Sequence, residues 1–391
     1  MRILLANEKL GWFGGVEQTV ADSARALRER GHEVHLAHGE QTPREPSRYA
    51  ALFDSCAPCR ELGDAAGEGL GAIARRVGAQ VVYFHKIKRL VGRDERGAAT
   101  RAVRMVHDHD LCCPRRHKYF VHNAAICNHP AGWRCYLDLA WVERSPSSPL
   151  GVAFRGLGPH RAELRRNREL DVCLVGSRFM KRELEMNGLP AARVEIIPPA
   201  VRREERAPTD AAEARHVLFV GQLIRGKGVD LLLEALARVP DEWTASIVGE
   251  GNARPALEEQ ARRLRLEGCA RFGGWARNEE VDAHYAAARL LAVPARWPEP
   301  FGMIGLEAMH NARPVVAFPA GGIPDWLEDG RNGLLAPQND VEALAACITR
   351  LLDDRELATR MGRAGWERAR GEFNFDACID RLEAALQRSL P

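Results

Sequence analysis

The chain has 391 residues, a formal net charge of +3 and 28% charged residues. This length exceeds what one hydrophobic core usually supports, which predicts two domains, and the balanced charge argues against nucleic-acid binding. No apolar run approaches the roughly 18 residues that a membrane span needs, and the opening MRILLANEKL leads into a strand rather than a signal peptide. We therefore expect a cytoplasmic protein.

One stretch is locally basic, from Arg161 to Arg168 with the sequence RAELRRNR. Charge runs of this kind usually form the solvated face of a helix. The alternative is a peripheral contact with an anionic surface at the inner face of the membrane, and the sequence leaves both interpretations open.

The ten cysteines are unevenly distributed. Cys56 and Cys59 have the two-residue gap that zinc knuckles and redox pairs use, but no second pair completes a zinc finger. A structural metal site and scattered free thiols both remain open, and we predict no metal in the functional site. Six cysteines fall in the first 135 residues: Cys56, Cys59, Cys112, Cys113, Cys127 and Cys135.

The first half of the chain opens with a β-α-β pattern. Arg2 to Ala6 is predicted as a buried strand, Val16 to Arg30 as an amphipathic helix and Glu33 to Ala37 as a second strand. Further strands alternate with helical segments, which predicts a parallel sheet with helices on both faces. These strands are Val81 to Phe84, Ala102 to Val106, Val172 to Val175 and Val194 to Ile197.

Residues 108–160 do not fit this alternation. They are rich in Cys, His, Pro and Gly and form a long insertion, which in a compact domain is more often functional than idle. A proline-rich, charged segment from Pro198 to Arg215 follows the first set of strands, and we place the domain linker there.

After the linker the same alternation starts again, so we predict an α/β fold of two Rossmann-like, doubly wound domains. Their expected ranges are residues 1–200 and 201–370. Ligands in such sheets bind outside the carboxyl ends of the strands, so two facing domains would form a substrate cleft between them. The second set of predicted strands is His216 to Val220, Thr244 to Val248, Ala270 to Gly273, Leu290 to Val293, Pro314 to Phe318 and Gly333 to Ala336.

The most informative stretch is EPFGMIGLE, from Glu299 to Glu307. It follows a strand and enters a helix near Gly302, where unpaired amides and the helix dipole suit a phosphate. Glu299 in the loop can accept hydrogen bonds from sugar hydroxyls, and Glu307 can bind a second polyol. The wide spacing makes the two carboxylates hydroxyl clamps rather than an acid/base pair.

From Gly221 to Leu335 the chain resembles the family 4 glycosyltransferases of the two-domain GT-B fold. The N-terminal half agrees more loosely, through FGGVE, VHD and VGS. The resemblance implies a retaining, metal-independent hexosyltransferase without a cofactor, which transfers a sugar from a nucleotide diphosphate donor to a saccharide or lipid-linked hydroxyl in cell-envelope polysaccharide or glycoconjugate synthesis. The matching motifs are GQLIRGKGVDLLLEAL, VGEGNARPALE, WPEPFGMIGLEAM and AGGIPDWLEDGRNGLL.

The same resemblance implies roles for single residues. Glu299 would contact the donor-sugar hydroxyls, and Glu307 would hold the ribose diol. Amides at the start of the helix would bind the diphosphate, and Lys227 matches the family lysine. The remaining predicted donor-binding positions are Gly302, Met303, Ile304, Gln222 and Gly249.

Gln222 stands where the family usually has arginine, so one phosphate cation is missing from its expected position. Arg225, three residues on, is our candidate for supplying that charge, and a solvent-facing arginine is the alternative. In the first domain, Gly14 and Gly15 would border the diphosphate and the acceptor, or simply form a tight turn. The turn lacks the GxGxxG fingerprint, which argues against a nicotinamide-dependent dehydrogenase.

His107-Asp108-His109-Asp110 ends a predicted strand and has two interpretations. Asp108 and Asp110, with nearby cysteines, have the ligand types of a metal site. In the family that the chain resembles, the histidine at the position of His107 lines the donor-sugar pocket without a metal. We favour this second interpretation, and a buried structural histidine is a further alternative.

No carboxylate is forced by its spacing to act as the nucleophile of a double displacement, so the resemblance implies front-face attack. An epimerase, a phosphorylase and a non-catalytic sugar-nucleotide-binding subunit are the alternatives that reuse this fold. The insertion, with Tyr119, Trp133 and Trp141, is our candidate for acceptor recognition. The apolar stripe of the C-terminal helix, within residues 371–391, either crosses back to the first domain or caps the second.

Overall fold

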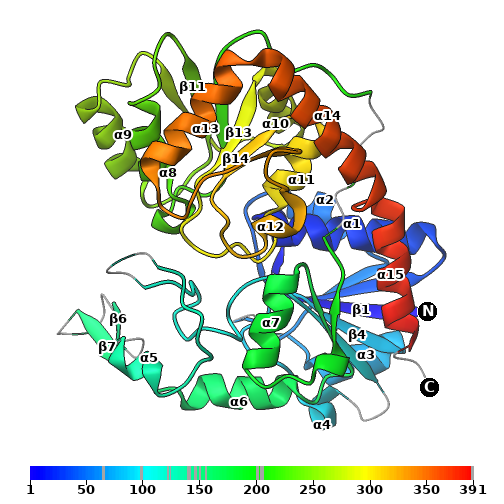
Figure 1. Cartoon of the computed structure of the whole chain (residues 1–391). Helices are drawn as coiled ribbons and strands as arrows, with labels where there is room; N and C mark the ends of the chain where they lie inside the picture. Colours follow the sequence, from blue (N-terminus) through cyan, green and yellow to red (C-terminus); the bar gives the residue numbers. More distant parts are fainter. Residues whose placement is uncertain are drawn as a thin grey trace. The chain divides into compact units, whose positions relative to one another are not determined.

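The computed structural model describes residues 1–63, 67–96, 100–120, 123, 125–138, 142–144, 148, 151–154, 156–199, 202 and 207–388. The chain forms two compact units, each built on a parallel sheet with helices (Figure 1). Unit 1 comprises Met1–Arg116, Asn128–Arg202 and Phe375–Pro391, and unit 2 comprises His117–Cys127 and Arg203–Asn374. The predicted α/β class with two Rossmann-like sheets is confirmed.

Unit 1 contains a seven-stranded sheet in the order β3-β2-β1-β4-β5-β8-β9, with parallel pairing throughout. The strands are β1 (Arg2–Leu10), β2 (Glu33–Gln41), β3 (Ser55–Pro58), β4 (Val81–Phe84), β5 (Arg101–Val106), β8 (Val172–Val175) and β9 (Val194–Ile196). The helices are α1 (Gly15–Glu29), α2 (Pro46–Ala50), α3 (Leu70–Val77), α4 (Arg93–Arg96), α5 (Arg134–Leu137), α6 (Gly158–Asn167), α7 (Arg178–Met186), η1 (Ala191–Arg193) and α15 (Phe375–Arg388).

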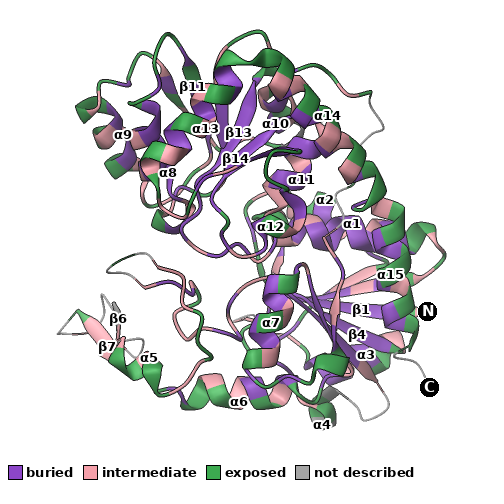
Figure 2. Cartoon of the chain, in the orientation of Figure 1, coloured by how far each residue is buried: buried purple, intermediate pink, exposed green. Residues whose placement is uncertain are grey.

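The sheet of unit 1 is covered on both faces because successive side chains of a strand point to opposite sides. Ile3 and Leu5 of β1 share one buried cluster with Val20 of α1 and Leu382 of α15. Leu4 belongs to a separate cluster on the other face. Figure 2 shows residues of the central strands coloured as buried. The run of apolar residues in β1 is therefore explained by burial on two faces.

The C-terminal helix α15 belongs to unit 1. Its apolar stripe packs beside α1, and its polar side contacts the end of that helix: Glu383 lies 2.9 Å from the Nη1 of Arg30 and 2.8 Å from the Nε2 of His32. Because residues 203–374 separate α15 from the rest of its unit, the chain crosses between the two units and returns.

Unit 2 contains a six-stranded parallel sheet in the order β12-β11-β10-β13-β14-β15. The strands are β10 (His216–Val220), β11 (Thr244–Val248), β12 (Ala270–Gly274), β13 (Leu290–Val293), β14 (Val315–Ala317) and β15 (Gly333–Leu335). The helices are η2 (Arg225–Lys227), α8 (Val229–Leu236), α9 (Arg254–Arg263), α10 (Asn278–Ala287), α11 (Met303–His310), α12 (Ile323–Trp326), α13 (Val341–Asp353) and α14 (Arg355–Gly371).

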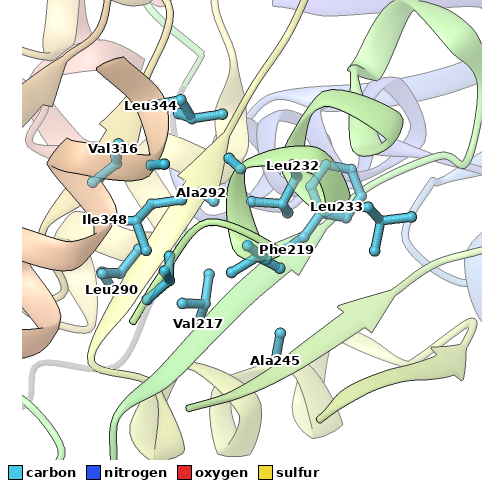
Figure 3. Close-up of a cluster of buried hydrophobic side chains, with 14 of the residues drawn as sticks. Val217, Phe219, Leu232, Leu233, Ala245, Leu290, Ala292, Val316, Leu344 and Ile348 are labelled. Atoms are coloured by element: carbon cyan, nitrogen blue, oxygen red, sulfur yellow. The ribbon is translucent and has the colours of Figure 1, made fainter. Parts of the chain in front are cut away.

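One buried cluster of unit 2 lies between its sheet and several helices, among them α8 and α13 (Figure 3). Val217 and Phe219 of β10 point toward Leu232 of α8, and Ile348 of α13 packs beside Leu290 of β13. All five side chains are almost fully buried, and burial of each such side chain contributes about 1.5–3 kcal/mol. This core fixes β10 and β13, whose carboxyl ends carry the candidate site.

The predicted insertion divides between the two units. Residues 142–144 (β6) and 152–154 (β7) pair antiparallel, and the helix α5 precedes them. The segment His117–Cys127 instead belongs to unit 2, although the sequence assigned residues 1–200 to one domain. Within this segment Tyr119 bridges to Ile126 in antiparallel fashion. Trp141 lies outside the described residues.

Among the helices in the described ranges, none has both the length and the apolar character that crossing a membrane requires. The basic stretch forms α6 and the residue after it. Arg161 and Arg165 are exposed, whereas the Nη1 of Arg166 lies 3.3 Å from the carboxylate of Glu163.

Candidate functional site

A short loop at the end of β10 positions Lys227. The 3₁₀ turn η2 carries Lys227, and Gly228 follows it with φ of +71°, which favours glycine. A Cβ at Gly228 would also collide with the carbonyl oxygen of Pro294. Glycine at this position therefore allows the loop to pack against the end of β13 before α8 begins.

The ion pair of Arg296 and Asp230 fixes the same loop. The guanidinium binds the carboxylate in bidentate fashion, with 2.6 Å between Nη2 and Oδ2. The amide of Arg296 also donates to the carbonyl of Gly226 over 2.9 Å. These two contacts join the loop of Lys227 to the segment that leads to Glu299, and the sequence analysis had singled out neither partner.

Lys227 and Glu299, both predicted from the sequence, are in direct contact. The ammonium of Lys227 lies 2.6 Å from Oε1 of Glu299, and 5.3 Å from the centroid of the Trp297 ring. Glu299 is only 4% exposed. A positive and a negative group thus meet in a largely dehydrated setting, where both charges act more strongly than in water.

The loop AGG, residues 320–322, positions Glu299. The amide of Glu299 donates to the carbonyl of Ala320, and the amide of Gly322 donates to the carbonyl of Glu299 over 2.7 Å. Gly321 has φ of +67°, and a Cβ there would collide with the backbone of Glu299. Glycine at position 321 therefore permits the backbone contact that holds the glutamate.

The helix α11 starts directly after Glu299-Pro-Phe. Gly302 caps it with φ of +95°. The buried indole of Trp326 donates from Nε1 to the carbonyl of Phe301 over 2.6 Å, and its ring leaves no space for a Cβ at Gly305. The two glycines of GMIGLE therefore have separate causes: one allows a left-handed cap, and the other accommodates an aromatic ring.

Glu307 lies on α11 at partial exposure. Its Oε2 is 3.2 Å from the hydroxyl of Tyr285, a fully buried residue of α10 that also lies 3.2 Å from the carbonyl of Ile304. Because a tyrosine hydroxyl has one proton, it donates to one of these oxygens at a time. Met303 and Ile304 occupy the first turn of α11, whose amides have no acceptor within the helix.

Two further predicted positions lie at the ends of β10 and β11. Gly249 has φ of +145°, and a Cβ there would collide with the carbonyl of Gly221, so the two strand ends touch backbone to backbone. Gln222 is exposed, and its carbonyl accepts from the amide of Ile224 over 3.0 Å. Arg225 is also exposed.

In unit 1, His107 is paired with a second histidine that the sequence analysis had not singled out. Nε2 of His107 lies 3.0 Å from Nδ1 of His85, and the two rings stack at 5.3 Å. Burial lowers the pKa of His107 to about 4 and lowers the pKa of His85 well below its usual value. Both imidazoles are therefore neutral at pH 7.

The two carboxylates that suggested a metal site are bound by cations. The ammonium of Lys86 contacts Asp108 and lies 3.5 Å from Asp110, and Arg116 lies 3.3 Å from Asp110. Burial raises the pKa of Asp110, as does the neighbouring charge of Asp108. Burial also opposes ionisation of Asp108, but the charge of Lys86 outweighs it and lowers the pKa.

Metal-ligating side chains do not cluster in the part of the chain that the structure describes: it contains no group of three or more His, Cys, Asp or Glu residues suited to an ion. The two thiols of the CxxC pair have different contacts. The Sγ of Cys59 lies 3.2 Å from Glu61, whereas the Sγ of Cys56 points to the carbonyl of Ala50. Burial raises the pKa of the Cys59 thiol to about 12 and the pKa of the Cys56 thiol to about 11.

Hydrogen bonds link the glycine turn of unit 1 to Lys86, the residue after His85. The amide of Gly14 donates to the buried carboxylate of Glu17 over 2.9 Å, and this carboxylate accepts from Asn7 over 3.4 Å. The side-chain oxygen of Asn7 in turn accepts from the amide of Lys86. Gly15 is the first residue of α1. A continuous polar network thus runs from the glycine turn to the residue after His85.

Comparison with known proteins identifies the family. The profile described as glycosyl transferases group 1 matches residues 201–368, and that of glycosyltransferase family 4 matches residues 13–205. A lipopolysaccharide core biosynthesis glycosyltransferase from Rhizobium meliloti is 33% identical over 261 residues, which cover 62% of this chain and 73% of that protein. The chain belongs to the family 4 glycosyltransferases.

A second relative of this glycosyltransferase is a GDP-mannose-dependent α-(1-6)-phosphatidylinositol monomannoside mannosyltransferase from Mycolicibacterium smegmatis. It is 33% identical over 263 residues, covering 60% of this chain and 69% of that protein. Among solved structures, Anabaena Alr3699/HepE in complex with UDP-glucose has a TM-score of 0.75 at 19% identity, covering 99% of this chain and 100% of that one. The GT-B fold that the motifs implied is confirmed.

Some of the predicted site residues of the glycosyltransferase are thus in contact, whereas others belong to different units. Lys227 and Glu299 touch, whereas His107 lies in unit 1 with the glycine turn. Five further residues have no signal in the local sequence, because the groups that they contact lie 19 or more positions away in the chain. These are His85, Asp230, Tyr285, Arg296 and Trp326.

Proposed function

We propose that this glycosyltransferase moves a hexosyl group from a nucleoside diphosphate donor to a hydroxyl acceptor, with retention and without a metal ion. The proposal rests on the contact of Lys227 with Glu299 beside the start of α11. A lysine ammonium can neutralise a departing diphosphate, and a fixed carboxylate can accept hydrogen bonds from sugar hydroxyls. The lysine therefore suits the diphosphate of such a donor, and the glutamate suits its sugar.

Two similar proteins support the donor class. The mycobacterial relative is named as GDP-mannose-dependent, and the Anabaena structure is a complex with UDP-glucose. Both are nucleoside diphosphate sugars with different bases, so we assign the class of donor to this chain and neither the base nor the sugar.

In this scheme the diphosphate lies at the start of α11. The amides of Met303 and Ile304, together with about half a positive charge from the helix dipole, bind its oxygens, and Gly302 allows close approach. Glu307, oriented by the hydroxyl of Tyr285, accepts from the ribose diol. Gln222 and Gly249, at the neighbouring strand ends, border the nucleotide.

The transfer step is a front-face displacement. A bond forms between the acceptor oxygen and the anomeric carbon while the bond from that carbon to the phosphate oxygen breaks. The acceptor proton passes to the β-phosphate, and Lys227 and the helix amides stabilise the negative charge that develops there. Arg225, the candidate from the sequence for a second cation, lines a pocket beside Trp297 and is assigned no role in this step. The roles of His107 toward the donor sugar, and of Gly14 and Gly15 toward the diphosphate and the acceptor, stay predictions from the family resemblance.

The acceptor is a saccharide or a lipid-linked saccharide of cell-envelope polysaccharide or glycoconjugate synthesis. The similarity to a lipopolysaccharide core glycosyltransferase supports this class. We place the reaction in the cytoplasm, at the inner face of the membrane if the acceptor is lipid-linked. The exposed arginines of α6 offer a surface for such a contact.

A donor screen with EDTA present tests the proposal. UDP-, GDP-, ADP- and TDP-sugars are compared for thermal stabilisation and slow hydrolysis, using the wild type, Lys227→Ala and Glu307→Ala. We expect one nucleotide sugar to stabilise the wild type, and both variants to lose most of that shift. Lys181→Ala, which changes a partly exposed lysine of unit 1, is the control.

Three other results would count against the proposal. Binding only with a divalent ion would contradict the metal-free site, and no binding of any nucleotide sugar would contradict the donor class. Binding without hydrolysis, and without transfer to any saccharide offered, would favour a non-catalytic sugar-nucleotide-binding subunit.

A further inference from the structure

Next to the Lys227–Glu299 pair, unit 2 contains a pocket of about 420 Å³. It adjoins the pair through Trp297, whose ring lies 5.3 Å from the ammonium of Lys227. Two of its walls come from the segment His117–Cys127, which the chain contributes from within its first half. The lining residues are His117, Tyr119, Ile224, Arg225, Gly226, Asn252, Ala253 and Trp297.

Specific contacts hold these walls in place. Gly226 lies under both large rings: a Cβ there would be 3.3 Å from Cβ of Trp297 and 3.8 Å from Cε1 of Tyr119. The amide of Trp297 donates to the carbonyl of Gly226 over 3.1 Å. The ring of His117 packs 4.7 Å from that of Tyr119, which is also held by its strand bridge to Ile126. A side chain at Gly226 would therefore crowd Trp297, whereas Tyr119 would stay at ordinary contact distance.

The chemistry of the pocket favours a sugar that carries negative charge. Aromatic faces bind the apolar C–H faces of a sugar ring, and the amide of the exposed Asn252 suits its hydroxyls. None of the eight lining residues is acidic, and Arg225 is one of them. Arginine binds phosphate and carboxylate groups through two parallel hydrogen bonds.

We propose that this pocket binds the acceptor, and that the acceptor sugar carries a phosphate or carboxylate group that Arg225 recognises. The inference rests on the proposed function, because it assumes that the donor binds at Lys227, at Glu299 and at the start of α11. A transferase needs two sugars side by side, and the pocket lies next to the proposed donor groups because Trp297 lines it and lies beside Lys227. The anion that Arg225 binds is then the acceptor's charged group and not the donor diphosphate.

Ligand-observed NMR titrations with three probes test the inference: glucose 6-phosphate, glucuronate and methyl glucoside. We expect the two anionic sugars to bind the wild type at least tenfold more tightly than the neutral one. Arg225→Gln should remove this preference. Tyr119→Ala should weaken all three, whereas Tyr119→Phe should not, because it keeps the ring. Phe154→Ala, which removes an exposed aromatic ring of unit 1, is the control.

Binding of the nucleotide sugar found in the donor screen shows whether Arg225 binds a charged group of the acceptor or the diphosphate of the donor. We expect Tyr119→Ala and Arg225→Gln to bind it within about twofold of wild type, whereas Lys227→Ala loses it. Equal affinity of the wild type for all three probes, or binding that Tyr119→Ala leaves unchanged, would overturn the inference. A parallel loss of nucleotide-sugar affinity in Tyr119→Ala would assign the pocket to the donor. If no nucleotide sugar binds the wild type, the proposed function fails, while the three probes still decide the pocket.

Discussion

The imidazole rings of His85 and His107 share one hydrogen bond, 3.0 Å from Nδ1 of His85 to Nε2 of His107. His85 is almost completely buried at the end of β4, and His107 follows β5, the neighbouring strand. Since Nε2 of His107 is occupied, only its Nδ1 is left to contact a ligand. His85 therefore sets which edge of the His107 ring is available.

This pair predicts a loss of stability in mild acid. Histidine in the unfolded chain has a pKa of about 6.5, whereas burial lowers the pKa of His107 to about 4. Between these values the unfolded state binds more protons, so the stability that His107 contributes is complete above pH 6.5 and falls as the pH drops toward 4. The full difference is about 3 kcal/mol at most.

Thermal midpoints at pH 7.5 and pH 5 measure this effect. We expect His107→Gln to lose less stability than the wild type on acidification, and His85→Gln to behave in the same way, because burial also lowers the pKa of His85. His129→Gln, at an exposed position, is the control and should follow the wild type. Equal pH dependence in all four proteins would contradict the neutral histidine pair.

The Lys227–Glu299 contact predicts non-additive effects on catalysis. Either Lys227→Met or Glu299→Gln leaves the partner without its counter-charge, so each should lower kcat/KM by about 10²–10³, as loss of one transition-state charge contact does. The double variant should be little worse than the poorer single variant, because both residues act as one unit.

Stability provides a second measurement on the same pair. Removal of one partner from a fully buried pair costs about 3–5 kcal/mol, and we expect about 1–3 kcal/mol here because Lys227 retains 18% exposure. The matched control is Lys181→Met, whose pair with Glu185 is about one third exposed on each side. Additive kinetic losses in the double variant would mean that the two residues act independently.

The strands of both sheets could be predicted from the sequence because they are buried on two faces. Runs such as Val81–Phe84 and Leu290–Val293 are continuously apolar, and both are strands over those residues. The strand Ser55–Pro58 was missed because it lies at a sheet edge and contains Ser, Cys and Pro, which give no apolar run. The predicted strands thus reflect burial more than intrinsic preference.

The candidate site was predictable only where local chemistry marks it. Glycines next to glutamates at the start of a helix predict a ligand site, so Glu299 and Glu307 stand out in the sequence. Tyr119 stands out only as an aromatic residue of the insertion, since nothing in residues 108–160 indicates that their central part packs with a loop more than 100 positions later. Pairing across such distances depends on tertiary structure, which a single sequence does not encode in a local pattern.

The contacts of the buried Trp326 ring predict a loss of stability for two substitutions beside α11. Gly305→Ala would place a methyl group in the buried indole ring, and overpacking of this kind costs about 1–3 kcal/mol. Trp326→Phe would remove the 2.6 Å hydrogen bond to the carbonyl of Phe301 and leave that group unsatisfied, which costs about 1–3 kcal/mol.

Urea unfolding and donor titration separate the two effects. Both variants should be less stable than the wild type, and both should also bind the nucleotide sugar less tightly, because Phe301 immediately precedes the helix cap. Gly371→Ala, at a helix end where a Cβ meets nothing, is the control. A loss of stability without any loss of donor affinity would show that the start of α11 does not depend on Trp326.

The bidentate pair of Arg296 and Asp230 predicts a change in rate caused by a residue that does not belong to the proposed donor contacts. Asp230→Asn removes the charge that compensates Arg296, which is only 9% exposed, so we expect about 1–3 kcal/mol of destabilisation. The loop that Arg296 holds carries Lys227, and misplacement of a catalytic group by about 1 Å can cost about 100-fold in rate. We expect kcat to fall about tenfold or more, with a smaller change in donor KM.

Glu328→Gln, in the exposed pair with Arg331, should change neither stability nor kcat. If Asp230→Asn lowers stability while kcat stays at the wild-type value, the loop keeps its position without the ion pair, and the backbone bonds from Arg296 and Trp297 to Gly226 suffice to place the lysine.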